Sequence, residues 1–273
     1  MWNMFSKLFG KRNSFKNIIQ PFPFRGGFET KKVFDDGTRA PLSRERKIIL
    51  EQVVLETEKL FRGSSIHWEI DGGLSVSLLR GQFIGEHRDL DVAVEESELE
   101  QLQKIIEAKG YGLFVTLGTE KRETMHMKRV DWKEFSEAPT FLFWIIAVDK
   151  NGLIRKDLAL SFINVHIIKR SEKGLPFGEE GVELPAHWFR PRVINFLGSR
   201  INVASPLKTA YYKLQSIRNY DLTDLRHMFE SGLISCLDVE EIEKVIGSEP
   251  GKKYKENYYK ARKRMIEQIK QWD

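Results

Sequence analysis

Two carboxylates stand two positions apart in the stretch DLDVAV, residues 89–94. The alternation predicts a β-strand, and side chains at i and i+2 of a strand share a face, so Asp89 and Asp91 are expected to lie together. Two carboxylates on one face repel each other unless a divalent cation lies between them. Oxygen ligands at this spacing suit Mg²⁺, which completes its octahedron with water and substrate phosphates. A solvated strand edge is the alternative.

A glycine pair, Gly72 and Gly73, precedes this strand and follows an expected strand at 66–70. Glycine lacks a Cβ atom, so the pair predicts a tight turn into a short buried helix that ends near Gly81. The backbone N–H groups of a glycine turn at a helix N-terminus bind phosphate. The pair therefore favours the magnesium interpretation of the two carboxylates.

The glycine pair, the short helix and the string RDLDVAV together resemble the nucleotidyltransferase superfamily that includes DNA polymerase β. Within it, GEHRDLDVAV is particularly similar to the antibiotic adenylyltransferases that act on aminoglycosides and lincosamides. The resemblance is good over 66–94 and looser over 141–230. It implies an α/β (α+β) protein with a polymerase β-like nucleotidyltransferase core, in which helices flank a mixed sheet, and a helical C-terminal region.

The resemblance also implies roles for individual residues. Asp89 and Asp91 would bind Mg²⁺. Lys213 corresponds to a basic residue that contacts the triphosphate in these transferases, and a solvated helix lysine is the alternative. The residues that we assign to nucleotide binding are Gly72, Gly73, Ser75, Arg80 and Lys213.

The third acid of the superfamily is where this sequence departs from the pattern. Relatives carry Val-Asp-Val-His on a later strand, and the matching residues here, 163–166, have Asn164 in place of the acid. In such enzymes that carboxylate helps to hold the catalytic metal and takes the proton of the attacking hydroxyl, whereas an amide ligates weakly and is no base. Three interpretations stay open: another residue substitutes, catalysis is slow, or nucleotide is bound without transfer. The candidate substitutes are Asp149, Asp157 and His166.

A second resemblance covers residues 181–214, which are similar to the phosphocholine-transferase and fukutin-related family. Those proteins share the polymerase β-like core and move a phospho-alcohol from a CDP-linked donor onto a glycan. Their usual Trp-Asp-Asp-Asp before the acidic pair is absent here, where Glu86-His87-Arg88 stand instead. This family therefore supplies the alternative function.

Residues 220–225, YDLTDL, resemble the Lys-Asp-x-x-Asp-Leu signature of the antibiotic transferases, with Tyr220 at the usual lysine position. Aspartates at the start of a helix commonly accept hydrogen bonds from its first backbone N–H groups. Capping of the following helix is therefore an alternative to a chemical role for Asp221 and Asp224.

Hydrophobic periodicity predicts the remaining elements. Helices are expected at 43–61, at 97–110 with Ser97 as N-cap, from Ser205-Pro206 onward, and at about 237–247 and 252–271. Strands are expected at 111–117, 124–130, 141–148 and 158–168, and a loop is expected at 131–140. These elements suggest an N-terminal arm at 1–40, a nucleotidyltransferase core at 41–200 and a helical C-terminal region at 201–273.

The composition of the 273-residue chain is that of a globular protein, with 41% hydrophobic and 30% charged residues. A net charge of +5 suits anionic ligands such as nucleotides without requiring nucleic acid. A single cysteine, Cys236, excludes an intrachain disulfide and a cysteine-based zinc site. We expect no transmembrane helix and no secretory signal peptide, and hence a cytoplasmic protein. Peripheral membrane contact through the basic segments 1–40 or 252–264 is an alternative to a packed arm and a solvated helix face.

Together these features predict a Mg²⁺-dependent nucleotidyltransferase. It would move a nucleoside monophosphate from an NTP, with ATP as the first choice, to a hydroxyl of a small-molecule acceptor by in-line displacement. The alternatives are phospho-alcohol transfer from a CDP-linked donor to a glycan, and a catalytically degenerate nucleotide-binding protein because of Asn164. Nucleic acid is not expected as a partner, because the basic residues are not interleaved with a stacking platform.

Overall fold

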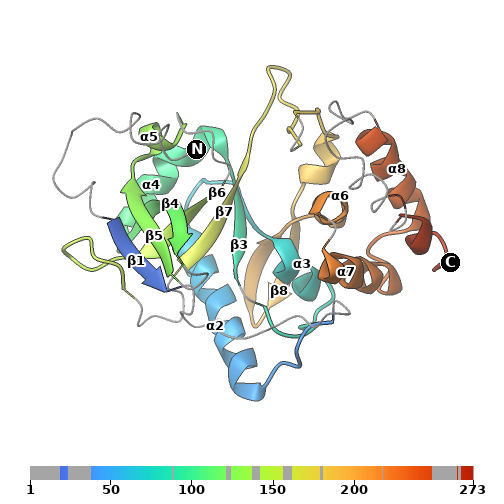
Figure 1. The fold of residues 1–273 in the computed structure, drawn as a ribbon, viewed down its shortest axis with the longest axis horizontal. Helices are drawn as coiled ribbons and strands as arrows, with labels where there is room; N and C mark the ends of the chain where they lie inside the picture. Colours follow the sequence, from blue (N-terminus) through green and yellow to red (C-terminus); the bar gives the residue numbers. More distant parts are fainter. Residues whose placement is uncertain are drawn as a thin grey trace.

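The computed structural model describes residues 19–23, 38–87, 89–120, 124–136, 142–155, 162–178, 181–216, 218–247, 263 and 266–272. In this part of the chain a large sheet forms one half of the molecule, and the C-terminal helices gather beside it (Figure 1). The sheet is nine-stranded, in the order β1-β5-β4-β6-β7-β3-β2-β9-β8. The strands are β1 (Ile19–Pro23), β2 (Trp68–Asp71), β3 (Asp91–Glu95), β4 (Tyr111–Glu120), β5 (Thr124–Val130), β6 (Leu142–Ala147), β7 (Phe162–Ile168), β8 (Arg192–Phe196) and β9 (Ser199–Val203).

The sheet is mixed, because β3 pairs with β7 and β2 pairs with β9 in parallel, while the other neighbours are antiparallel. The helices are α2 (Arg44–Phe61), α3 (Gly72–Leu79), α4 (Leu99–Ala108), α5 (Trp132–Ser136), α6 (Pro206–Ser216), α7 (Asn219–Glu230) and α8 (Cys236–Gly247). The expected α/β class, with helices flanking a mixed sheet and a helical C-terminal region, is confirmed. Residues 19–23 of the expected N-terminal arm form an edge strand on β5.

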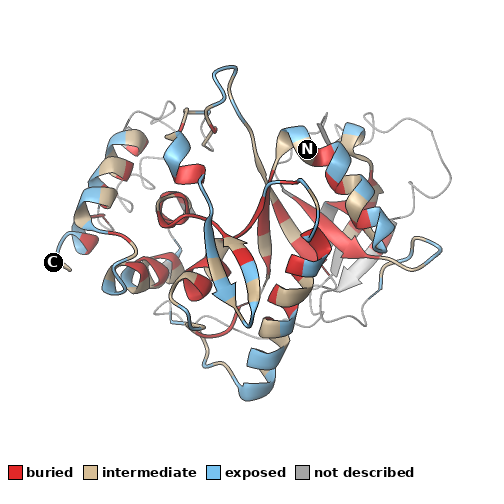
Figure 2. Cartoon of the chain, turned by 180° about the vertical axis from the view of Figure 1, so that it is seen from behind, coloured by how far each residue is buried: buried red, intermediate tan, exposed pale blue. Residues whose placement is uncertain are grey.

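Two hydrophobic clusters hold these layers together. The first joins the sheet to α2 and α4 and includes Val53, Ile70 and Val92. Figure 2, a view from behind, shows buried strands beside the half-exposed α2. The second cluster joins α6, α7 and α8 around Trp188 and Tyr211. Because strand side chains alternate, burying Ile70 and Val92 on the α2 side turns their neighbours in sequence to the opposite face of the sheet.

Several predicted elements are confirmed. Ser43 caps α2 by accepting the N–H of Arg46, and Ser205 accepts the N–H of Lys208 at the start of α6. The strand pairs β4–β5 and β6–β7 are antiparallel neighbours, as expected. Among the described residues, no helix combines the length and the apolar character that a membrane span requires.

Three local predictions are wrong. Ser97 does not cap α4, because the 3-10 turn Glu96–Glu98 comes first and Glu98 takes the N-cap position. The segment 131–140 contains α5, which starts with reciprocal bonds: Asp131 Oδ1 accepts the N–H of Glu134, and Glu134 Oε2 accepts the N–H of Asp131. Strand β3 begins at Asp91, so Asp89 precedes the strand instead of lying within it. Most of the predicted helix at 252–271 lies outside the described residues.

Candidate active site

The glycine pair connects β2 directly to α3. Asp71 ends the strand in an extended conformation, and Gly72 begins the helix with a φ of +64°, which a residue with a side chain rarely adopts. A Cβ atom on Gly72 would overlap the carboxylate of Asp91. A Cβ atom on Gly73 would lie 2.6 Å from Nη2 of Arg39. Gly72 is therefore required by its backbone conformation and by the approach of Asp91, and a side chain at Gly73 would displace the guanidinium of Arg39.

Three polar residues lie side by side across three neighbouring strands. Asp71 is paired in register with Asp91 between β2 and β3, and Asp91 is paired with Asn164 between β3 and β7. Nδ2 of Asn164 donates a hydrogen bond of 2.6 Å to Oδ1 of Asp91. The residue at the position of the missing third acid is thus in contact with the second acid of the DxD motif.

The local electrostatics favour a cation at this place. Burial and the neighbouring charge of Asp89 raise the pKa of Asp91 to about 6. Oδ1 of Asn164 is buried and has no hydrogen-bond partner among the described residues. Among the same residues, no group of three His, Cys, Asp or Glu side chains has the arrangement of a metal site. The residues that could hold a Mg²⁺ ion here are the carboxylates of Asp89 and Asp91, with the amide oxygen of Asn164 as a weaker ligand.

A buried ion cluster, which the sequence did not indicate, fixes the position of Asp71. Nζ of Lys208, on α6, donates to Glu69 Oε1 at 2.5 Å and to Asp71 Oδ2 at 3.1 Å, and its side chain is only 2% exposed. Burial raises the pKa of Glu69. Burial also acts to raise the pKa of Asp71, but Lys208 and His166 outweigh it and hold that pKa well below its usual range. Asp71 is therefore an ionised, positioned carboxylate.

His166 connects Asp71 to the DxD motif. Its Nδ1 lies 3.2 Å from Oδ2 of Asp71, and its Nε2 lies 3.3 Å from Nδ2 of Asn164 and 3.7 Å from Oδ1 of Asp91. Because Asp71 accepts and the Asn164 amide donates, the neutral form that fits these contacts has the proton on Nδ1 and a lone pair on Nε2. Burial acts to lower the pKa of His166, but the hydrogen bond to Asp71 and the charges of Asp91 and Asp71 raise it overall, so His166 binds a proton more readily than a free histidine.

Of the two candidate substitutes that lie among the described residues, Asp149 and His166, it is His166 that the structure brings to Asp91. The carboxylate of Asp149 accepts the N–H groups of Asn151 and Leu153 in the turn after β6. Asp157 lies outside the described residues.

The other predicted nucleotide-binding residues have partners within the protein. Oγ of Ser75 donates to the carbonyl oxygen of Gly72 at 2.7 Å and contacts Oγ1 of Thr209. Arg80 follows the last residue of α3, about 12 Å from its start, and its side chain contacts Ser231 and His227. The structure therefore places Ser75 at the glycine turn and Arg80 at the opposite end of the helix.

Lys213 is buried between two aspartates. Its Nζ lies 2.5 Å from Oδ2 of Asp224 and 3.3 Å from Oδ1 of Asp221. Asp221 also accepts the backbone N–H of Arg218, which confirms the predicted capping role of this aspartate. Asp224 forms a bidentate pair with Arg39, at 3.2 Å from Nε and 2.8 Å from Nη2. Direct contact of Lys213 with a nucleotide stays a prediction.

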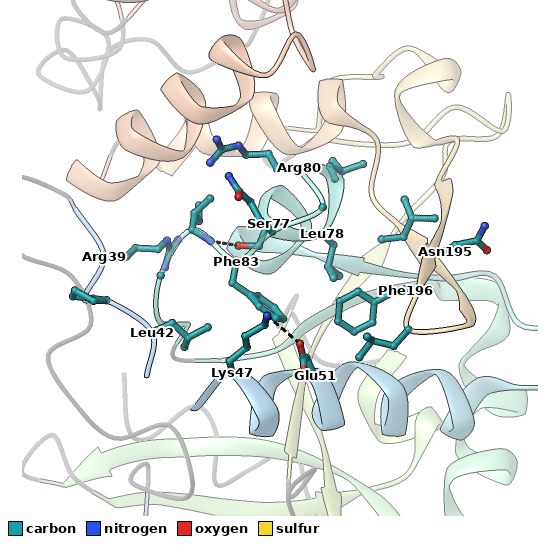
Figure 3. A pocket seen from close by; sticks show the side chains of 18 residues that line it. Arg39, Leu42, Lys47, Glu51, Ser77, Leu78, Arg80, Phe83, Asn195 and Phe196 are labelled. Atoms are coloured by element: carbon teal, nitrogen blue, oxygen red, sulfur yellow. Dashed lines mark hydrogen bonds and ion pairs between the residues drawn. The ribbon is translucent and has the colours of Figure 1, made fainter. Parts of the chain in front are cut away.

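Arg39 also borders a cavity of about 920 Å³ between α2, the loop after α3 and the β8–β9 hairpin. Figure 3 shows Phe83 and Phe196 in this cavity, above the ion pair between Lys47 and Glu51. The cavity lining includes Arg39, which also binds Asp224, but none of Asp71, Asp91 and Asn164.

The comparison with family models gives a match to the aminoglycoside-2''-adenylyltransferase family over residues 53–133. This segment contains the glycine pair and the DxD motif, and the match confirms the expected relation to the antibiotic nucleotidyltransferases. No curated protein matches the sequence significantly.

Several solved structures share parts of the fold at low identity. The lincosamide antibiotic adenylyltransferase LnuA, solved with lincomycin, has a TM-score of 0.42 and 18% identity, with 66% of this chain and 98% of that chain covered. The antibiotic-resistance factor ANT(2'')-Ia has a TM-score of 0.47 and 10% identity, with 74% and 92% covered. A nucleotidyltransferase from Thermotoga maritima has a TM-score of 0.36 and 13% identity, with 68% and 94% covered. These likenesses are distant.

Proposed function

We propose that this chain, whose residues 53–133 match the aminoglycoside-2''-adenylyltransferase family, is a Mg²⁺-dependent nucleotidyltransferase. It would transfer a nucleoside monophosphate from an NTP, with ATP as the first choice, to a hydroxyl of a small-molecule acceptor. The observation that supports this most is the close approach of Gly72 to Asp91, because it joins a phosphate-binding turn to a pair of metal-binding carboxylates.

Different residues of the chain would bind the phosphates and the metal ion. The first backbone N–H groups of α3 would hold the phosphates, and Gly72 leaves room for Asp91 beside them. Asp89, Asp91 and the amide oxygen of Asn164 would hold Mg²⁺, which when bound neutralises phosphate charge and stabilises the charge that develops in the displacement. Catalysis of this kind depends mainly on position and charge.

The proton of the attacking hydroxyl needs an acceptor, and Asn164 cannot serve. His166 lies two residues further along β7, and Asp71 holds its Nδ1 so that Nε2 faces Asn164 and Asp91. We assign His166 Nε2 as the proton acceptor. Lys208 donates to Asp71 and is itself held by Glu69, so Lys208 and Glu69 are positioning residues for Asp71 and His166.

A transfer assay tests the function. The protein is incubated with Mg²⁺, with each of the four NTPs labelled at the α-phosphate, and with a panel of aminoglycosides, lincosamides and other polyhydroxylated compounds. The proposal predicts labelled acceptor and released pyrophosphate, both lost in Asp91→Asn. Transfer of phosphocholine from CDP-choline to a glycan, with no NTP transfer, would instead support the second family. Metal-dependent NTP binding with no transfer from any donor would support a degenerate nucleotide-binding protein.

A further inference from the structure

Two arginines from distant segments pack against one tyrosine at the start of α7. Cζ of Arg218 lies 4.5 Å from the centroid of the Tyr220 ring, and Cζ of Arg39 lies 5.4 Å from it. The face of an aromatic ring attracts guanidinium groups electrostatically. Tyr220 therefore helps to hold two like charges close together, which would otherwise repel each other.

Each guanidinium is also fixed by a fully buried carboxylate. Arg39 makes a bidentate pair with Asp224, and Nε of Arg218 donates to Oδ2 of Asp221 at 2.9 Å. Lys213 contacts both aspartates. The lysine thus orients the carboxylates, and the carboxylates orient the arginines.

The network is open to solvent at one of its cations. Among the described residues it joins three cations, Arg39, Lys213 and Arg218, to two carboxylates. The side chains of Lys213 and Arg39 are 5% and 7% exposed, whereas that of Arg218 is 53% exposed. A ligand can therefore reach this network at Arg218, whereas Lys213 and Arg39 are buried behind it.

Arg39 borders the candidate active site, and Arg218 is connected to Arg39 through the Tyr220 ring. Nη2 of Arg39 lies 2.6 Å from the place that a Cβ of residue 73 would take, so the glycine admits the guanidinium to the turn. Arg218 lies within electrostatic reach of Asp89. Partial burial acts to lower the pKa of Arg218, but the hydrogen bond to Asp221 and the charges of Asp221, Tyr220 and Asp89 raise it overall.

We propose that Arg39, Tyr220 and Arg218 form an arginine clamp, in which the exposed Arg218 binds the polyphosphate of the donor nucleotide and the buried Arg39 positions it through the Tyr220 ring. The clamp rests on the proposed function, and it takes over the phosphate contact that the sequence suggested for Lys213. A guanidinium matches two oxygens of a phosphate with its planar fork. Arg39 is bound to Asp224 and to the carbonyl oxygen of Glu86, so it holds the Tyr220 ring from a fixed position.

Titration calorimetry with Mg²⁺ and ATP, ADP, AMP or inorganic tripolyphosphate tests the clamp. Arg218→Gln is the principal variant. Arg226→Gln is its matched control, because Arg226, on α7, is like Arg218 an exposed arginine over an aromatic ring, with its Cζ 5.1 Å from the centroid of Trp272. Tyr220→Leu removes the ring that holds the arginines, and Tyr220→Phe retains it. Arg39→Lys keeps the charge and removes the fork.

The clamp predicts that Arg218→Gln weakens ATP and tripolyphosphate binding about tenfold or more while AMP binding changes much less. Tyr220→Leu and Arg39→Lys should weaken ATP binding in the same direction, whereas Arg226→Gln and Tyr220→Phe should match the wild type. Thermal melting curves show which variants remain folded.

Wild-type ATP affinity in a folded Arg218→Gln protein overturns the clamp, as does an equal loss for AMP and ATP. If this variant binds normally while Asp89→Ala/Asp91→Ala abolishes ATP binding, the clamp fails and the proposed function stands. Absence of any Mg²⁺-dependent nucleotide binding by the wild type overturns both.

Discussion

Asn164 donates a 2.6 Å hydrogen bond to Asp91 across the parallel strands β7 and β3, at the position where related enzymes carry a third carboxylate. In the absence of a metal ion, the amide of Asn164 stabilises the cluster of Asp71, Asp91 and Asn164, because it places a hydrogen-bond donor where a third carboxylate would repel the other two. The same replacement of a carboxylate by an amide weakens the binding of a metal ion at this site.

Replacing Asn164 by aspartate should reverse both effects. Without Mg²⁺, Asn164→Asp is expected to lower the free energy of unfolding by about 1–3 kcal/mol, because the donor to Asp91 is lost and a third carboxylate is added. With Mg²⁺ the loss should shrink, and the apparent Mg²⁺ affinity should rise. Chemical denaturation with and without Mg²⁺ measures this. Equal stability of the two proteins in the absence of Mg²⁺ would mean that the hydrogen bond from Asn164 to Asp91 does not stabilise the protein.

His166 should matter for turnover and little for nucleotide binding. Loss of a positioned base commonly costs about 10²–10⁴ in rate, so His166→Ala is expected to lower kcat by that order while the ATP affinity stays within about twofold. The matched control is His67→Ala, since the side chain of His67 is 81% exposed and contacts Glu98 away from the cluster. A His166→Ala enzyme with wild-type kcat would remove His166 from the mechanism.

Alanine at Gly72 should destabilise the protein far more than alanine at Gly81, a second glycine with a positive φ. Gly72→Ala adds a positive-φ strain of about 1–2 kcal/mol and a clash with Asp91. Gly81 also has a positive φ, of +74°, and a Cβ there would meet nothing within 4 Å, so Gly81→Ala tests the strain alone. Thermal melting of both variants compares them. Equal losses of Tm would show that the approach of Asp91 to the turn is not tight.

Asp224 gives the protein a defined acid sensitivity. Burial acts to raise its pKa, but Lys213 and Arg39 outweigh burial and lower it below the ordinary value of 3.8. The stabilisation by this ionised carboxylate is therefore complete above pH 3.8 and is lost as the pH falls through the lower folded-state pKa. Asp224→Asn should cost about 3–5 kcal/mol near neutral pH, because two buried cations lose their partner.

The difference in stability between the wild type and Asp224→Asn should narrow below pH 3.8. Denaturation curves of both proteins at pH 7 and at pH 3 measure it. A difference that is the same at both pH values would mean that Asp224 is not an ionised partner of Arg39 and Lys213.

The sequence predicted the parts of the site that depend on local pattern. The glycines before a short apolar helix and the alternation after Asp89 are patterns within about one supersecondary unit. The family pattern placed Asn164 at the position of the third acid, but it did not indicate the hydrogen bond from Asn164 to Asp91. The position of Asp89 ahead of the strand was missed, because alternation alone does not show which residue makes the first ladder bond.

The residues that support the site could not be found in this way. Asp71 and His166 meet only through the order β7-β3-β2 of the strands, which no local pattern specifies. Arg39 lies in a segment without periodicity, and its partner Asp224 is 185 residues away. In the sequence, Lys208 and Lys213 cannot be told from solvated lysines on a helix surface. Only the packing of α6 shows that both are buried.

Calorimetric titration of ATP into the protein with and without Mg²⁺, for the wild type and for Asp89→Asn/Asp91→Asn, tests whether these two carboxylates form a nucleotide site. We expect Mg²⁺-dependent binding to the wild type that the double variant loses. The melting temperature of the double variant in the absence of Mg²⁺ should stay equal or rise, because repulsion between the carboxylates is relieved. Metal-independent ATP binding that is the same in a folded double variant would contradict a nucleotide site built on these two carboxylates.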